Sequence, residues 1–253
     1  MAEVCILMVP SLRSSMAKAT SLIMEADYDT VFVNFPHNLQ SIVLSYASER
    51  ISFRDFVNMV KSERLIPEPV NMWLYLNQPI LESLPLLQKR NARIFCYRDV
   101  DDFHLSMENA SKIANLTLKV NVTGKVDVEE WIKTIRQAVN LSSVDLEAEF
   151  IGCKAEGKSI CVTDLFGWKL VKRIKEFGHR VSVRCVEKLY YMKPVETLEI
   201  LLERGKLTPQ DAEQLIREHA KFVRDYVLST ENIDEAYFSW LGKRKILGQN
   251  AKA

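Results

Sequence analysis

Five short apolar runs alternate along the chain with stretches whose apolar residues have helical spacing. The runs are Val4–Val9, Thr30–Phe35, Ala92–Tyr97, Ser159–Thr163 and Arg180–Val186. Strands that are short and apolar, often with β-branched residues, are typical of parallel sheets that are covered on both faces. Because parallel neighbours need a crossover connection, this order predicts βαβ units. We therefore predict an α/β fold: a mainly parallel open sheet with helices on both faces and the first strand internal.

Two regions depart from this rhythm. Residues at about 37–90 are mostly helical, and we predict a helical insertion there, broken by Pro67, Pro69, Pro79 and Pro85, with Ser52 capping one helix. Residues 206–253 form a helical C-terminal region, in which Thr208 caps a helix that starts at Pro209. We accordingly divide the chain into a core at 1–205 and a C-terminal region at 206–253. Within the core, "LTLKVNVTGKV" is either a short strand or an irregular segment.

Composition disfavours several classes of protein. The formal net charge is +1, so the chain has no global basic surface for nucleic acid or an anionic membrane. No run of 18 apolar residues occurs and the first residues lack a signal-peptide pattern, so we expect a cytoplasmic protein with no membrane association. The five cysteines are odd in number and have no CxxC spacing, which predicts reduced thiols.

The distribution of glycine is the sharpest exclusion. Only eight glycines occur, and none precedes Gly124. Dinucleotide-binding turns of the form GxGxxG and phosphate loops of the form GxxxxGK(S/T) need glycines where the backbone approaches phosphate. The first strand–turn–helix, around "VPSLRSS", has none. We therefore exclude an ordinary Rossmann domain and a P-loop NTPase, and we expect no cofactor.

Candidate catalytic residues follow the third and fourth predicted strands. Open parallel sheets hold ligands outside the carboxyl ends of their strands, and the densest polar cluster there is "YRDVDDFH". Its Asp99 and Asp102, with Asp164 after the fourth strand, are candidates for acid–base chemistry. If a metal ion were held, Asp99, Asp102 and His104 would be its ligands, although no metal-binding spacing is present. The alternative is an acidic turn that caps the next helix.

The remaining polar residues at these strand ends are candidates for ligand binding. They are Ser11, Arg13, Ser14, Asn34, His37, Arg98 and Trp168. Arg13 and the free amides at the start of the following helix could hold a small anion. In the alternative interpretation, Ser14 or Ser15 caps that helix and Arg13 is solvated. We interpret His179, in a helix-to-strand turn, and His219, on an apolar helix stripe, as structural.

A family resemblance runs through the same segments. The stretch "VCILMVPSLRSSMAKATSLIMEADYDTVFVNFP" resembles the opening of the TraB / erythromycin-esterase / ChaN-like superfamily. "ARIFCYRDVDDFH" resembles its next strand, and "GKSICVTDLFGWKLVKRIKEFGHRV" resembles its later strand–loop–helix. The resemblance implies hydrolysis or metal binding at the strand ends. However, "VPSLRSS" and "TDLFGW" lack the superfamily's histidines, and Asn34 replaces an acid, which implies a degenerate member that keeps Asn34, Asp99 and Asp164.

Two functions stay open on this basis. The first is a cytoplasmic, non-catalytic binding or assembly subunit that contacts a protein partner or a second copy through Tyr237, Phe238 and Trp240, unless these aromatic residues pack within the chain. The second is a hydrolase or transferase, with or without a metal ion, acting on a small polar substrate at the strand ends. Nucleic-acid binding through the basic tail "GKRKILGQNAKA" ranks third.

Overall fold

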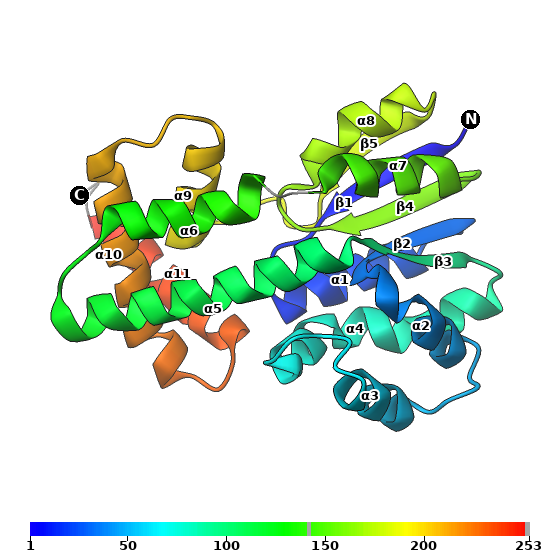
Figure 1. The fold of residues 1–253 in the computed structure, drawn as a ribbon, viewed down its shortest axis with the longest axis horizontal. Coiled ribbons are helices and arrows are strands. Elements are labelled where there is room, and N and C mark those ends of the chain that lie inside the picture. The colour runs from blue at the N-terminus through cyan, green and yellow to red at the C-terminus, as the bar shows by residue number, and fades with distance from the viewer. Residues whose placement is uncertain (141–142, 251–253) are drawn as a thin grey trace. The chain divides into compact units, whose positions relative to one another are not determined.

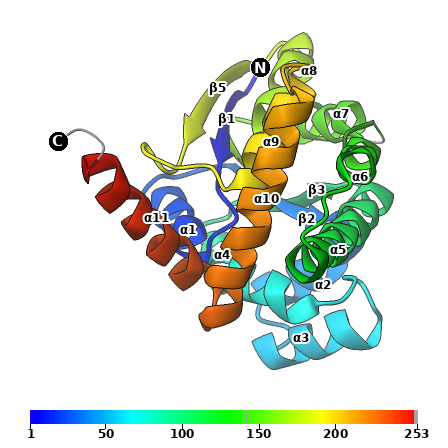
Figure 2. The ribbon, with the colours of Figure 1, turned by 90° about the vertical axis from the view of Figure 1, so that its left-hand side faces the viewer.

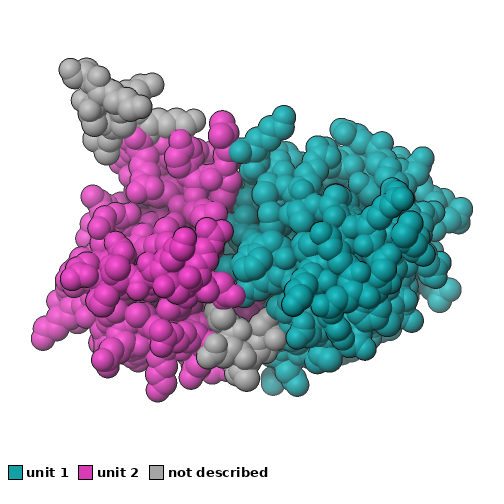
Figure 3. Space-filling view, turned by 90° about the horizontal axis from the view of Figure 1, so that it is seen from above, with its two compact units in different colours: residues 1–104, 143–188 teal, residues 105–142, 189–253 magenta. Residues whose placement is uncertain are grey.

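The computed structural model describes residues 1–140 and 143–250, which form two compact units (Figures 1 and 3). Unit 1 consists of 1–104 and 143–188, and unit 2 of 105–142 and 189–253. This grouping differs from the predicted division at residue 205, because it places 105–142 and 189–205 with the C-terminal helices. The cause is packing: apolar side chains from 113–135 and from 195–220 form one buried cluster.

Unit 1 is built on a five-stranded sheet in which every strand pairing is parallel. Its strands are β1 (Glu3–Met8), β2 (Thr30–Pro36), β3 (Arg93–Arg98), β4 (Lys158–Thr163) and β5 (Arg180–Cys185). The order is β3-β2-β4-β1-β5, so the first strand is internal as predicted. The predicted fold class is confirmed, and each strand lies within one residue of its predicted bounds.

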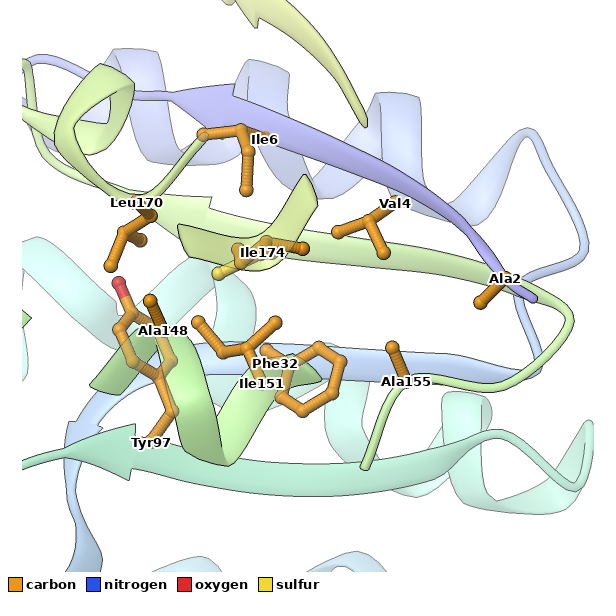
Figure 4. Close-up of a cluster of buried hydrophobic side chains, with 11 residues drawn as sticks. Ala2, Val4, Ile6, Phe32, Tyr97, Ala148, Ile151, Ala155, Leu170 and Ile174 are labelled. Atoms are coloured by element: carbon orange, nitrogen blue, oxygen red, sulfur yellow. The ribbon is translucent and has the colours of Figure 1, made fainter. Parts of the chain in front are cut away.

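Helices cover both faces of this sheet (Figure 1). One face carries α7 (Val144–Lys154), the short turn η2 (Gly167–Lys169) and α8 (Leu170–Glu176); the other carries α1 (Arg13–Met24), α2 (Gln40–Ala47) and α4 (Val70–Lys89). Under the first face, Val4 and Ile6 of β1 pack with Ile151 and Ile174 from α7 and α8 (Figure 4). This apolar layer fixes where the helices begin, and hence which side chains stand at the strand ends.

The helical insertion after β2 is confirmed. It comprises the turn η1 (His37–Leu39), α2, α3 (Phe53–Ser62) and α4. Ser52 caps α3 in a reciprocal capping box, since its hydroxyl accepts from the Asp55 N–H and the Asp55 carboxylate accepts from the Ser52 N–H. The predicted breaks at Pro79 and Pro85 are wrong, because α4 runs unbroken through both. Its Ile80, Leu81 and Leu84 are almost fully buried, and this packing holds the helix together.

Gly157, just before β4, gives a matched test of local packing. Its φ is +51°, and an added Cβ would collide with the carboxylate of Asp29, which accepts from the Lys158 N–H at 2.7 Å. Gly178 also has a positive φ, +81°, but its Cβ would meet nothing within 4 Å. We expect Gly178→Ala to lower the free energy of unfolding by about 1 kcal/mol, and Gly157→Ala by more, because it adds the collision. Urea unfolding measures both; equal losses would contradict this account.

Unit 2 is helical (Figure 2). It contains α5 (Val100–Thr123) from Leu105 onward, α6 (Val128–Asn140), α9 (Pro194–Glu203), α10 (Pro209–Asp225), the turn η3 (Val227–Ser229) and α11 (Ile233–Asn250). The Thr208 hydroxyl accepts from the Asp211 N–H at 3.1 Å, so the predicted cap of α10 is confirmed. Among the described residues, no helix combines the length and apolar character that crossing a membrane requires.

The segment "LTLKVNVTGKV" is neither a strand nor irregular over most of its length, because α5 continues to Thr123. Leu116 and Val120, four residues apart, are buried, whereas Leu118 and Val122 are 59% and 76% exposed. Burial thus recurs with the helical period, although the apolar residues themselves alternate. Packing against Trp131 and Ile135 of α6 selects the helix.

Candidate functional site at the carboxyl ends of the strands

A single guanidinium, that of Arg98, gathers the polar side chains at the end of β3. Its Nε lies 2.8 Å from Glu147 Oε1, and its two Nη atoms lie 3.7 Å from Asp102 Oδ2 and 3.8 Å from Asp164 Oδ2. It also donates to Asn34 Oδ1 at 3.3 Å. The side chains of Arg98, Glu147 and Asp102 are 16%, 8% and 10% exposed, whereas that of Asp164 is 45% exposed. We call these five residues the Arg98 cluster.

The cluster also holds the starts of two helices. The Asp99 N–H donates to Glu147 Oε1 at 3.2 Å, and the Asp102 N–H donates to Asp99 Oδ1 at 2.9 Å, which caps α5. The Ser143 hydroxyl, just before α7, donates to Asp102 Oδ2 at 3.3 Å and Glu147 Oε1 at 3.4 Å. Negative side chains suit helix N-termini, where backbone N–H groups lack partners. The carboxylates therefore face both Arg98 and backbone N–H groups that have no partner within their own helix.

Burial and the opposite charges of the cluster act against each other on its pKa values. It raises the pKa of Glu147 above its ordinary value, although the adjacent Arg98 and the Asp99 N–H act in the opposite direction. Burial alone would lower the pKa of Arg98, but the surrounding carboxylates, Glu147 and then Asp164, outweigh it and raise this pKa. Arg98 is therefore a permanent cation, and Glu147 is the carboxylate most costly to keep ionised.

The structure brings together part of the predicted catalytic set. Asp102 and Asp164 both face Arg98, together with Asn34. Asp99 instead caps α5, as the alternative interpretation of an acidic turn described. Sequence reasoning missed Glu147, the nearest partner of Arg98. The one signal was an acid beside Ala148 and four residues before Ile151, both buried on the sheet-facing side of α7.

The two candidate histidines lie outside these contacts. His37 Nδ1 is 3.1 Å from the Cys96 carbonyl oxygen, and its ring packs edge-on against Phe150. His104 Nε2 is buried without a hydrogen-bond partner. The other two residues of the alternative metal set have different partners: Asp99 accepts from the Asp102 N–H, and Asp102 faces Arg98. In the described part of the chain, no three or more His, Cys, Asp or Glu side chains are placed to hold a metal ion. The alternative metal set of Asp99, Asp102 and His104 therefore does not form.

The turn after β1 differs from the predicted interpretation in which a serine caps the helix and Arg13 is solvated. Leu12 occupies the N-cap of α1 and supplies no side-chain cap, so the predicted cap by Ser14 or Ser15 is wrong. Ser15 is fully buried and its hydroxyl donates to Glu187 Oε1 at 3.1 Å. Arg13 is not simply solvated, because it donates to Gln78 Oε1 at 3.4 Å and lies over the Tyr75 ring. Anion binding by Ser11, Arg13 and Ser14 stays a prediction.

The remaining candidates divide by exposure. Tyr237 and Trp240 are buried at 3% and 7%; Tyr237 stacks on Tyr190, and Trp240 meets Phe222 edge-on. These two residues pack within unit 2, as the alternative interpretation held, which leaves Phe238, at 52% exposure, as the exposed candidate for a partner contact. Trp168, in η2, is 45% exposed.

Asp99 can be tested as a cap separately from any catalytic role. We expect Asp99→Ala to lower the free energy of unfolding by about 1 kcal/mol, because the Asp102 N–H loses its acceptor. Asp99→Asn keeps an acceptor and is expected to change stability by less than about 0.5 kcal/mol. Thermal and urea unfolding measure both. A similar loss in the two variants would show that the charge of Asp99, and not its capping oxygen, matters.

Comparison with known proteins leaves the family open. No family model, curated protein or solved structure matches this chain. The resemblance to the TraB / erythromycin-esterase / ChaN-like superfamily therefore stays a prediction.

Proposed function

We propose that this chain is a cytoplasmic, non-catalytic binding or assembly protein. One observation carries the proposal: where a parallel α/β enzyme would present free acid and base groups, Asp102 and Glu147 are buried and engaged with Arg98 and with hydrogen-bond donors at the helix starts. A general base must reach the proton that it abstracts, and a nucleophile must face its substrate. Side chains that are buried against each other serve neither purpose.

The same contacts describe a structural role. Arg98 stands at the end of β3, Asp102 in the first turn of α5, and Glu147 in the first turn of α7. Removing one partner of a buried ion pair leaves an uncompensated charge and is strongly destabilising, so such a network fixes one arrangement of its elements. The cluster therefore ties the first turns of α5 and α7 to the end of β3, and supports a rigid scaffold for partner binding within unit 1. The free thiols of all five cysteines are compatible with the cytoplasm.

A second candidate function, a hydrolase or transferase acting on a small polar substrate, is favoured by a different observation. Burial raises the pKa of Glu147, as in carboxylic acids that donate protons during catalysis. Asp164, with its side chain 45% exposed beside Arg98, could face such a substrate. In this case Asp164 would contact the ligand and Glu147 would exchange the proton.

Ligand-dependent melting separates the two functions. The purified chain is heated with divalent cations and with a panel of small polar compounds, in parallel with Asp164→Asn. Asp27→Asn serves as the matched control, because Asp27 is exposed and precedes β2, at the opposite end of the sheet. We expect no compound to raise the melting temperature in a way that depends on Asp164. A compound that stabilises wild type and Asp27→Asn by several degrees, but not Asp164→Asn, would overturn the proposal in favour of the enzyme.

A further inference from the structure

Strand β5 forms an open edge of the sheet (Figure 2). It pairs with β1, and within the described residues no strand lies on its outer side. The N–H groups of Arg180 and Val186 point inward, to the carbonyls of Ala2 and Met8. Because backbone groups alternate along a strand, the N–H and C=O groups of Val181, Val183 and Cys185 point outward. These outward groups are a template on which another chain can add a strand.

One face of this edge is hollow and basic. A hollow of about 620 Å³ lies over β1 and β5, and its charged lining residues are Lys158, Arg180, Arg184 and Glu3. Arg180 pairs with Glu3 at 3.3 Å, and the Lys158 ammonium lies 5.0 Å from the centre of the Tyr28 ring. Arg184 is exposed. Successive side chains of a strand point to opposite faces of the sheet, so those of Val183 and Cys185 lie on the other face. Positive charge therefore exceeds negative charge along this face.

The opposite face of β5 is apolar. Val181 packs partly against the buried cluster beneath α8, and Val183 is 44% exposed. A strand laid along β5 would place alternate side chains on the two faces, opposite Arg180 and Arg184 on one and opposite Val181 and Val183 on the other. Acidic side chains would complement Arg180 and Arg184, and aliphatic side chains would complement Val181 and Val183. The added strand should therefore alternate acidic and aliphatic residues.

We propose that the β5 edge binds an extended segment of a partner protein in which acidic and aliphatic residues alternate, and that this segment adds to the sheet as a further strand. The inference rests on the proposed binding function, although its surface lies away from the Arg98 cluster. Backbone hydrogen bonds would supply affinity, and the charge pattern would supply specificity.

A second copy of this chain fits the edge less well. Two β5 strands paired antiparallel about Ser182 would place Arg180 of each directly opposite Arg184 of the other, and like charges in opposed positions are destabilising. Paired about Val183, Arg184 would lie opposite Ser182 and Arg180 opposite Val186, so the arginines would gain no acidic partner in this register either. A nucleic acid would satisfy the cations but leave the outward N–H and C=O groups unpaired. An acidic extended polypeptide satisfies both.

Fluorescence anisotropy with three labelled peptides tests the proposal. The peptides are GEVEVEVG, its basic counterpart GKVKVKVG, and GEVEVEVG with the backbone nitrogen of every glutamate and valine methylated, which keeps the charge but removes the backbone donors along both edges. We expect the acidic peptide to bind at least tenfold more tightly than each of the other two. Equal binding of the acidic and basic peptides, or of the plain and methylated acidic peptides, would overturn the proposal, as would tighter binding of a single-stranded oligonucleotide.

A charge reversal locates the binding surface. Arg184→Glu is expected to weaken the acidic peptide at least tenfold and to strengthen the basic one. Lys175→Glu, an equal change on the exposed side of α8, is expected to leave both unchanged. Both sites are exposed, and circular dichroism checks that each variant is folded. An unchanged affinity in Arg184→Glu would overturn the proposal. Such a result would not contradict the proposed binding function, because that function is tested separately, by ligand-dependent melting of wild type and Asp164→Asn.

Discussion

Replacing Arg98 with methionine is expected to lower the free energy of unfolding by about 3–5 kcal/mol at pH 7. Methionine fills much of the same volume, so the loss is electrostatic: Asp102 and Glu147 would stay buried close to each other without the cation that faces them. Urea unfolding followed by circular dichroism measures the change. Arg93→Met is the matched control at the other end of β3, where the arginine and its partner Glu156 are 39% and 70% exposed and the expected loss is below about 1 kcal/mol.

The pH dependence of this deficit provides the contradicting outcome. Arg98 lowers the pKa of Glu147 against the effect of burial, so without Arg98 the folded-state pKa of Glu147 rises further. As the pH falls, the folded chain then binds a proton at Glu147 before the unfolded chain does. The stability lost at neutral pH is therefore regained as the pH falls toward the ordinary pKa of a carboxyl. Two outcomes would contradict this account: a loss of unfolding free energy that stays constant between pH 7 and pH 5, or a loss at pH 7 below about 1 kcal/mol. Either would show that the charges of the Arg98 cluster do not stabilise the fold.

Acid is expected to destabilise unit 2 through His219. Burial, with a smaller effect from Lys193, lowers the pKa of His219 from 6.5 to about 4, and its Nδ1 is buried without a hydrogen-bond partner. Below pH 6.5 the unfolded chain therefore takes up a proton that the folded chain refuses until about pH 4. Across that window the folded state should lose about 3 kcal/mol, since each pKa unit is worth about 1.4 kcal/mol.

The variant His219→Gln separates this effect from general acid unfolding. Glutamine is neutral at every pH, so its stability should fall less than that of wild type between pH 6.5 and pH 4.5. Hydrogen exchange locates the change, and protection should fall first in α6 and α10, where Trp131 packs against His219 with ring centres 5.8 Å apart. If wild type and variant lose the same stability over this range, His219 is not the titrating group.

Sequence by itself determined the features that depend on local chemistry. Strands β1 to β4 follow from runs that are apolar on both faces, because such residues gain stability only between two layers of helices. Strand β5 follows from valines that alternate with arginine and serine, the pattern of a strand with one polar face. The caps at Ser52 and Thr208 follow from side chains that accept from backbone N–H groups three residues on. The absence of glycines before Gly124 predicts that the first strand–turn–helix is neither a dinucleotide-binding turn nor a phosphate loop, and this stays a prediction. These signals lie within a few residues of the structure that they specify.

Only the tertiary structure decided which side chains meet. Glu147 follows Arg98 by 49 positions on another element, and nothing local marks it as the guanidinium's nearest partner. The helix across Leu116 and Val120, and the unbroken α4 through Pro79, depend on burial against other elements that outweighs local preference. Tyr237 looked suited to an interface but is buried beside Tyr190. Long-range packing determines which side chains are buried. Burial in turn sets their pKa values and contacts, and these determine what chemistry a site can perform.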